Sequence, residues 1–155
     1  MSVIVTDQGF TSDDWDGPIA ALNDAHPGCA IDLASSNDPN ELAGRISDIP
    51  MIRVDFPSFS DGRGFTIARQ LRLMGFKGRL RARGHVIADQ YAMARRAGFD
   101  EVEISDDLAQ RQPEDQWLFR ADWQAHDYQA RLRGAERGRI PGRAFRVTTR
   151  GASPG

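Results

Sequence analysis

The chain has 155 residues, of which 40% are hydrophobic and 27% are charged, and its formal net charge is -2. These values are typical of one soluble domain, and no apolar run approaches the roughly 20 residues that a membrane helix needs. Residues 1–10 lack a basic region followed by an apolar stretch, so no secretory signal is expected. The single cysteine, Cys29, excludes an internal disulfide and a cysteine metal cage, and it favours the reducing cytoplasm.

Charge is distributed unevenly along the chain. Residues 1–61 carry a net charge of -9, whereas residues 62–111 and 112–155 carry +4 and +3. All basic residues except Lys77 are arginines, a side chain suited to fixed contacts with oxyanions. A basic half within an acidic protein is weak evidence for nucleic acid binding, so no nucleic acid partner is expected, and a solvated surface with internal ion pairs explains the charges more simply.

Strands and single helices alternate through the middle of the chain. The N-terminal segment 2–6 is expected to form a strand or one arm of a hairpin, and a short helix is expected after Pro18. Strands are then predicted at 30–34, 51–56, 79–83 and 101–104, and helices at 40–46, 65–74 and 86–97. Gly75-Phe76 and Gly98-Phe99 end two of these helices. The repeat predicts an α/β fold with a parallel sheet of about four strands.

The predicted strands alternate apolar and charged residues, whereas a strand covered by helices on both sides is apolar throughout. One face of the sheet should therefore display four acids and four arginines: Asp32, Asp55, Glu101, Glu103, Arg53, Arg79, Arg81 and Arg83. Such a face is found inside a polar half-barrel, or on a two-layer sheet that another element closes. The expected cover is the segment from Trp117 to Tyr128 or, alternatively, a second copy of the chain.

The C-terminal part of the chain changes in composition. Residues 1–131 are expected to form a single α/β domain that ends in the covering helix. Residues 132–155 are rich in glycine and arginine and are expected to form a flexible tail.

Loop 57–64, which leads from a strand into a helix, is the richest candidate site. Its two glycines, Gly62 and Gly64, allow close approach of the backbone, while helix-start amides and the Arg63 guanidinium favour an anion. We expect an oxyanion site here, to which the neighbouring strand adds Arg81 or Arg83. A structural alternative explains the same residues, because Asp61 can cap the helix and the glycines can form a turn.

Other candidates follow the strands or begin helices. Asp55 and His85 lie at strand ends, where His85 could act as an acid or base, and Asp89 and Gln90 fall in a first helical turn, where capping competes with ligand contact. A lone histidine in a loop is more often plain polar surface. Cys29 is expected in the core, and with His26 and His126 it has no metal-ligand spacing, so neither a metal nor a cofactor is predicted.

The region from residue 50 to residue 104 resembles a bacterial family of unknown function, domain of unknown function 934. Its members are often labelled oxidoreductases and are encoded beside assimilatory sulfite reductase genes. The resemblance rests on Asp55-Phe56-Pro57, Phe59, Ser60-Asp61-Gly62-Arg63-Gly64-Phe65, Ala68, Leu71-Arg72, Gly75-Phe76, Gly78, Leu80-Arg81-Ala82, Gly84, Asp89-Gln90 and Ala97-Gly98-Phe99-Asp100. It implies a role in sulfate assimilation and no established catalytic residue. The sequence itself has no dinucleotide fingerprint, cysteine pair or iron-sulfur ligand set to support the oxidoreductase label.

Two functions remain open at this point, so the sequence does not decide whether the protein is an enzyme. The first is an accessory protein of sulfate or sulfite reduction that binds sulfite reductase or an oxyanion and has no redox chemistry of its own. The second is a small enzyme that acts on a phosphorylated or sulfated metabolite at the carboxyl ends of the strands.

Overall fold

Seven strands form one mixed sheet in the computed structural model, which describes residues 2–24 and 26–123. The chain divides into two compact units, 1–121 and 122–155, and every element named below lies in the first unit. The strand order is β2-β1-β7-β6-β5-β4-β3. The strands are β1 (Ser2–Thr6), β2 (Gly9–Thr11), β3 (Ile19–Ala21), β4 (Ala30–Leu33), β5 (Met51–Phe56), β6 (Arg79–Gly84) and β7 (Glu101–Ser105).

Strands β3 to β7 are parallel and lie side by side in chain order, while β1 pairs antiparallel with both β2 and β7. The α/β class and the parallel core are confirmed, but the prediction of about four strands is wrong. The antiparallel pairing of β1 with β2 confirms the hairpin alternative for residues 2–6, although no bounds were predicted for β2. The sequence pattern missed β3, where a helix was expected. Only a 3-10 turn, Leu22–Asp24, follows β3. Strands of three residues are too short to show a period, so these elements depend on their neighbours in the sheet.

The two longest helices lie against one face of the sheet. Helix α1 (Arg63–Leu73) contacts β5, and α2 (Tyr91–Ala97) contacts both β7 and α1. Short 3-10 turns at Pro39–Leu42, Ile46–Asp48 and Ala88–Gln90 replace parts of the predicted helices. Apolar side chains of the strands meet the helices in one core cluster, which includes Val54, Phe56, Leu80, Ala82, Val102 and Phe99.

Charged side chains occupy the other face of the sheet, which we call the charged face. The strand register aligns them in two rows across the strands. The first row is Asp32, Arg53, Arg81 and Glu101, and the second is Asp55, Arg83 and Glu103. Neighbouring strands are about 4.8 Å apart, so side chains in one row lie within reach of each other. The expected alternation of acids and arginines therefore becomes a set of cross-strand ion pairs.

The first row is tightly paired. Arg53 binds Asp32 through two hydrogen bonds of 2.6 and 2.8 Å, and its Nη1 donates to Glu103 at 3.1 Å. Arg81 donates to Glu101 at 2.6 Å and to Glu103 at 2.9 Å. The hydrogen bonds that Arg53 donates to Asp32 raise the pKa of Arg53 despite its partial burial.

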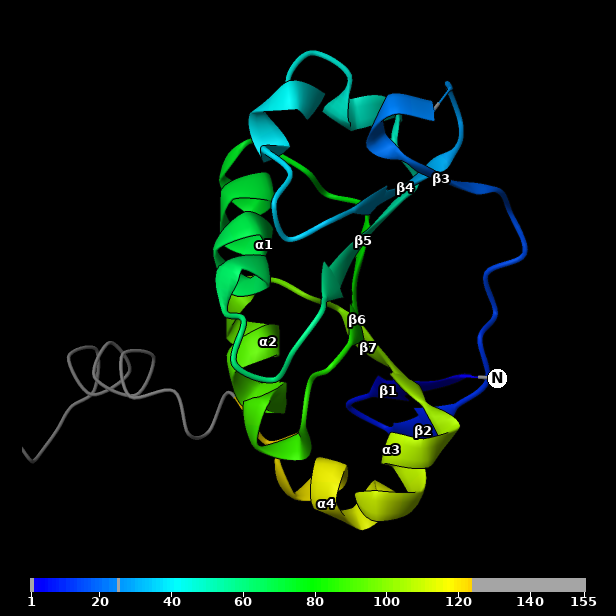
Figure 1. The fold of residues 1–155 in the computed structure, drawn as a ribbon, viewed down its shortest axis with the longest axis vertical. Coiled ribbons are helices and arrows are strands. Elements are labelled where there is room, and N and C mark those ends of the chain that lie inside the picture. The colour runs from blue at the N-terminus through cyan, green and yellow to red at the C-terminus, as the bar shows by residue number, and fades with distance from the viewer. Residues whose placement is uncertain (1, 25, 124–155) are drawn as a thin grey trace, which may run out of the picture. The chain divides into compact units, whose positions relative to one another are not determined.

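The connection between β2 and β3 covers part of the charged face. It crosses the sheet on the side opposite to α1 and α2 (Figure 1). Asp13 accepts a hydrogen bond of 3.0 Å from Arg81, and Asp14 pairs with Arg79. Burial alone would raise the pKa of Asp13, but the hydrogen bonds from Arg81 and the Trp15 amide, together with the positive charges of Arg81 and Arg79, outweigh burial and lower the pKa. The Asp13–Arg81 pair therefore stabilises the fold at pH values above the ordinary aspartate pKa of about 4. This stabilisation is lost as the pH falls through the lowered pKa of Asp13.

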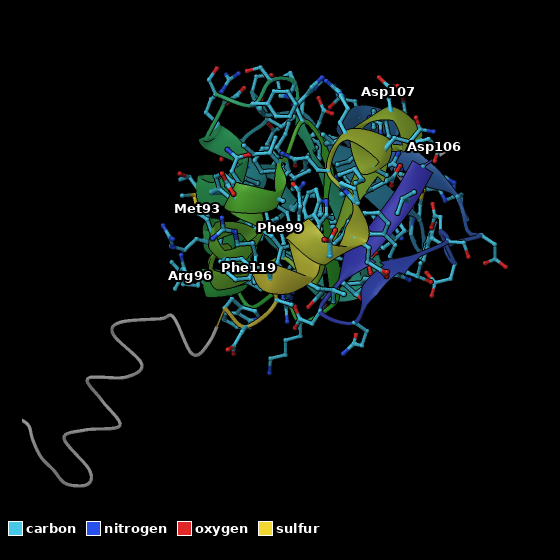
Figure 2. The ribbon with its side chains drawn as sticks, turned by 90° about the horizontal axis from the view of Figure 1, so that it is seen from below. Met93, Arg96, Phe99, Asp106, Asp107 and Phe119 are labelled. Atoms are coloured by element: carbon cyan, nitrogen blue, oxygen red, sulfur yellow. The ribbon has the colours of Figure 1, made fainter. Side chains whose placement is uncertain are left out.

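The prediction that Trp117 covers the charged face is wrong. This side chain is 1% exposed and belongs to the apolar core, where its ring meets Tyr91 of α2 edge to face at a centroid distance of 6.1 Å. Helix α4 (Glu114–Phe119) carries it, and α3 (Asp106–Arg111) precedes α4 and contacts β1, beside which it is drawn in Figure 2. Residues 124–128 and the expected tail from residue 132 lie outside the described residues.

Candidate functional site

The parallel strands end at one edge of the sheet, which we call the carboxyl edge. A pocket of about 370 Å³ lies there at the ends of β5, β6 and β7, and we call it the carboxyl-edge pocket. Ligands of sheets with parallel strands bind at this edge, because loops and helix starts gather there. The polar lining of the pocket consists of Ser2, Asp55, Arg83, His85, Glu103 and Ser105. Three of the site residues expected from the sequence, Asp55, Arg83 and His85, thus lie together.

Arg83 is the cation of the carboxyl-edge pocket. Its side chain is 48% exposed, and its guanidinium lies 3.5 Å from Asp55 and 3.6 Å from Glu103. Hydrogen bonds to a guanidinium are normally 2.7 to 2.9 Å long, so both of these contacts are loose. Arg83 therefore has donors to offer to a ligand.

His85 is oriented by the backbone of β5. Its amide donates to the Phe56 carbonyl at 2.9 Å, and its Nδ1 lies 3.2 Å from the same oxygen. A carbonyl oxygen can only accept, so Nδ1 carries the proton in this hydrogen bond. In the neutral ring, Nε2 is then the proton acceptor. The ring also meets Phe59 edge to face at 5.0 Å, which restricts its rotation.

Gly84 makes this arrangement of His85 possible. Its φ is +111°, and a Cβ at this position would lie 2.7 Å from the Phe56 carbonyl oxygen. Only glycine fits such a close approach of two strands with this backbone conformation. Gly84 was not among the site residues expected from the sequence, although its place between Arg83 and His85 was a signal for it.

Glu103 is a further residue of the pocket, expected from the sequence on the charged face but not in a site. Its side chain is 9% exposed, its Oε1 accepts from Arg53 and Arg81, and its Oε2 faces Arg83 at 3.6 Å. The signal was its position opposite Arg83, but this follows only from the register between β6 and β7. The buried Arg81 and the partly buried Arg53 balance the charge of this carboxylate within the sheet.

Gly62, Arg63 and Gly64, which we call the glycine loop, lie outside the lining of the pocket. Arg63 donates to Asp61 through Nε at 3.0 Å and through Nη2 at 2.7 Å, and Nη2 also donates to Ser35 at 2.9 Å. Hydrogen bonds from Arg63 hold the pKa of Asp61 well below its usual range. Asp61 therefore already supplies an anion to this arginine. Gly64 lets α1 approach β5, because a Cβ there would lie 2.4 Å from the Phe56 ring.

The remaining expected site residues are placed elsewhere. Arg81 is completely buried on the charged face and binds Glu101, Glu103 and Asp13. Asp89 forms an ion pair of 2.8 Å with Arg120. Gln90 donates to the Phe59 carbonyl at 3.0 Å and accepts from the Ile87 amide at 3.1 Å. Each of these three side chains has partners within the fold, and none lines the carboxyl-edge pocket.

The pocket combines three kinds of chemical group. Arg83 offers charge-assisted donors, His85 offers a ring nitrogen that can exchange a proton, and Asp55 offers a half-exposed carboxylate. Together they can bind an anionic group and move a proton beside it.

Residues 2–24 and 26–123 contain neither a candidate metal site nor a candidate membrane-spanning helix. No group of three or more histidine, cysteine or acidic side chains there could hold a metal ion. No helix in this part of the chain is both long and apolar enough to cross a membrane. Cys29 is buried at the start of β4, and its thiol lies 3.2 Å from the Ala30 carbonyl.

Comparison with known proteins gives one match. A family model described as a bacterial protein of unknown function (DUF934) matches residues 30–137, which include β4 to β7 and the helices that follow them. Neither a curated protein nor a solved structure matches the chain.

Proposed function

The chain belongs to the bacterial family of unknown function DUF934, and for this member we propose that the carboxyl-edge pocket binds a small oxyanion. The observation that carries the proposal is the loosely paired Arg83 guanidinium inside a pocket at the ends of parallel strands. Arg83 takes the oxyanion in a bidentate contact, and His85 lies beside it as a further donor when its ring is protonated.

The balance of charge around Glu103 supports this proposal. Arg53 and Arg81 already bind Glu103 Oε1, so this carboxylate does not hold Arg83 tightly. An oxyanion that binds Arg83 then replaces its contacts of 3.5 Å to Asp55 and 3.6 Å to Glu103 by shorter hydrogen bonds. The oxyanion site expected at the glycine loop would instead require the ligand to displace Asp61, which binds Arg63 with bonds of 2.7 and 3.0 Å.

Titration with sulfate, sulfite and phosphate at constant ionic strength tests the site. We expect millimolar dissociation constants for the wild type, which correspond to about 4 kcal/mol of binding free energy. At ten times the dissociation constant, the ligand should raise the free energy of unfolding by about 1.4 kcal/mol. Arg83→Gln should abolish this stabilisation, because it removes the charged donors from the pocket.

The matched control is Arg63→Gln, which removes the arginine of the glycine loop. It should leave the response to the three anions unchanged. If Arg63→Gln abolishes the response and Arg83→Gln does not, the oxyanion site lies at the glycine loop and our assignment is wrong. Equal responses in all three proteins would show that neither arginine binds an oxyanion.

We also propose that the protein serves sulfate or sulfite reduction as an accessory to sulfite reductase, which is what the family resemblance implies. Deletion of the gene should slow growth on sulfate and on sulfite as sole sulfur source, and growth on sulfide should stay normal. Wild-type protein should restore growth, and Arg83→Gln protein should not. Normal growth of the deletion strain on all three sources would contradict this role.

A second candidate function, an enzyme, is favoured by His85. Its Nδ1 is held by the Phe56 carbonyl, so that Nε2 of the neutral ring can accept a proton beside the anion-binding Arg83. This arrangement suits an enzyme that acts on a phosphorylated or sulfated metabolite, because such a substrate places its anionic group on the arginine. An enzyme would lose turnover on His85→Gln substitution, whereas a binding protein would show no turnover to lose.

A further inference from the structure

Arg83 stands between two carboxylates in the carboxyl-edge pocket. The register places Asp55 directly opposite Arg83 on β5, and Glu103 directly opposite it on β7. The two acids differ in their surroundings. Glu103 is 9% exposed and bound to Arg53 and Arg81, whereas Asp55 is 43% exposed and has the 3.5 Å contact to Arg83 as its ion pair.

A simple oxyanion leaves Asp55 in an unfavourable position. Once the oxyanion binds the Arg83 guanidinium, Asp55 loses its ion pair with this arginine and faces a second negative charge across the pocket. Like charges at such distances repel each other, and the repulsion grows where the pocket excludes water. The pocket thus attracts an anionic group on one side and resists it on the other.

A ligand that carries both signs of charge satisfies both residues. Its anionic group binds Arg83, and an ammonium group of the same molecule donates to Asp55 in place of the arginine. The pocket of about 370 Å³ lies near the lower end of the usual range for ligand sites, so it suits a small metabolite.

We propose that the carboxyl-edge pocket selects a small amphoteric molecule, whose anionic group binds Arg83 and whose ammonium group binds Asp55. This inference rests on the proposed oxyanion function and deepens it by naming the ligand class. Asp55 becomes the residue that determines specificity. It favours a ligand with an ammonium group and disfavours one with negative charge alone.

Binding of three sulfur oxyanions distinguishes these possibilities. Taurine carries a sulfonate and an ammonium group, ethanesulfonate carries the sulfonate alone, and sulfate is the simple oxyanion. Dissociation constants are measured by NMR titration of the full-length protein at constant ionic strength and neutral pH. We expect wild-type protein to bind taurine about tenfold more tightly than ethanesulfonate, as one added charge-assisted hydrogen bond predicts.

Two variants assign the effect to its residues. Asp55→Asn keeps the size of the side chain and removes its charge, so it should abolish the preference for taurine and strengthen the binding of ethanesulfonate and sulfate. Arg83→Gln should raise the dissociation constants of all three ligands at least tenfold. Arg111→Gln serves as the control, because Arg111 is 65% exposed on α3 and its pair with Asp107 is 3.9 Å long. It should leave all three dissociation constants unchanged.

The outcomes separate this inference from the function on which it rests. If ethanesulfonate and sulfate bind through Arg83 at least as tightly as taurine does, the ligand class is wrong and the oxyanion function stands. If none of the three ligands binds, or if their binding persists in Arg83→Gln, the oxyanion function itself fails. The comparison of taurine with ethanesulfonate uses the wild-type protein, so it decides the ligand class even if a variant does not fold.

Discussion

Replacing Arg81 by alanine is expected to lower the free energy of unfolding by about 3 kcal/mol. The side chain is completely buried, and its guanidinium binds three carboxylates, those of Glu101, Glu103 and Asp13. Removing the cation leaves two buried acids with less positive charge around them. The expected loss is at the lower end for a buried ion pair, because Arg79 still binds Glu101 and Arg53 still binds Glu103. Urea unfolding at neutral pH measures the change.

Arg83→Ala is the matched control for this substitution. The two arginines are two residues apart on β6 and point to the same face, but Arg83 is 48% exposed and its ion pairs are 3.5 and 3.6 Å long. Its removal should change the free energy of unfolding by less than about 1 kcal/mol. A similar loss in both variants would contradict the view that burial decides the importance of Arg81.

Replacing Trp117 by alanine should lower the free energy of unfolding by about 3 to 5 kcal/mol. The ring is 1% exposed, it packs against Tyr91, and its Nε1 donates to the Gln112 carbonyl at 2.9 Å. The substitution removes this hydrogen bond and opens a cavity between α4 and α2. Thermal and urea unfolding, followed by circular dichroism, measure the loss.

The neighbouring aromatic residue on α4 provides the control. Phe119, which is labelled in Figure 2, is an exposed residue of the same helix. Because its side chain is 72% exposed, Phe119→Ala should change the free energy of unfolding by about 0.5 kcal/mol or less. A chain that ends at Arg111 lacks Trp117, and we expect it to be unfolded or insoluble because the apolar core is left open. If Trp117→Ala is as stable as Phe119→Ala, α4 does not close the core.

The α/β class, four of the five parallel strands and the charged face were predictable from the sequence. Each of these strands is long enough to show its period of two, and the Gly-Phe pairs at 75–76 and 98–99 mark the ends of helices. The strand prediction at 51–56 agrees with β5 to the residue. In contrast, β2 and β3 have three residues each, and such short strands form only where a neighbouring strand supplies their hydrogen bonds.

The candidate site shows the same division between sequence and structure. The sequence by itself determined which residue types stand at the carboxyl ends of the strands, because a local pattern identifies each strand and its last residue. Only the tertiary structure decided that Arg81 is buried among carboxylates while Arg83 lies loosely paired in a pocket. The physical reason is that register and the covering β2–β3 connection, which join residues far apart in the chain, set the exposure and partners of each charge.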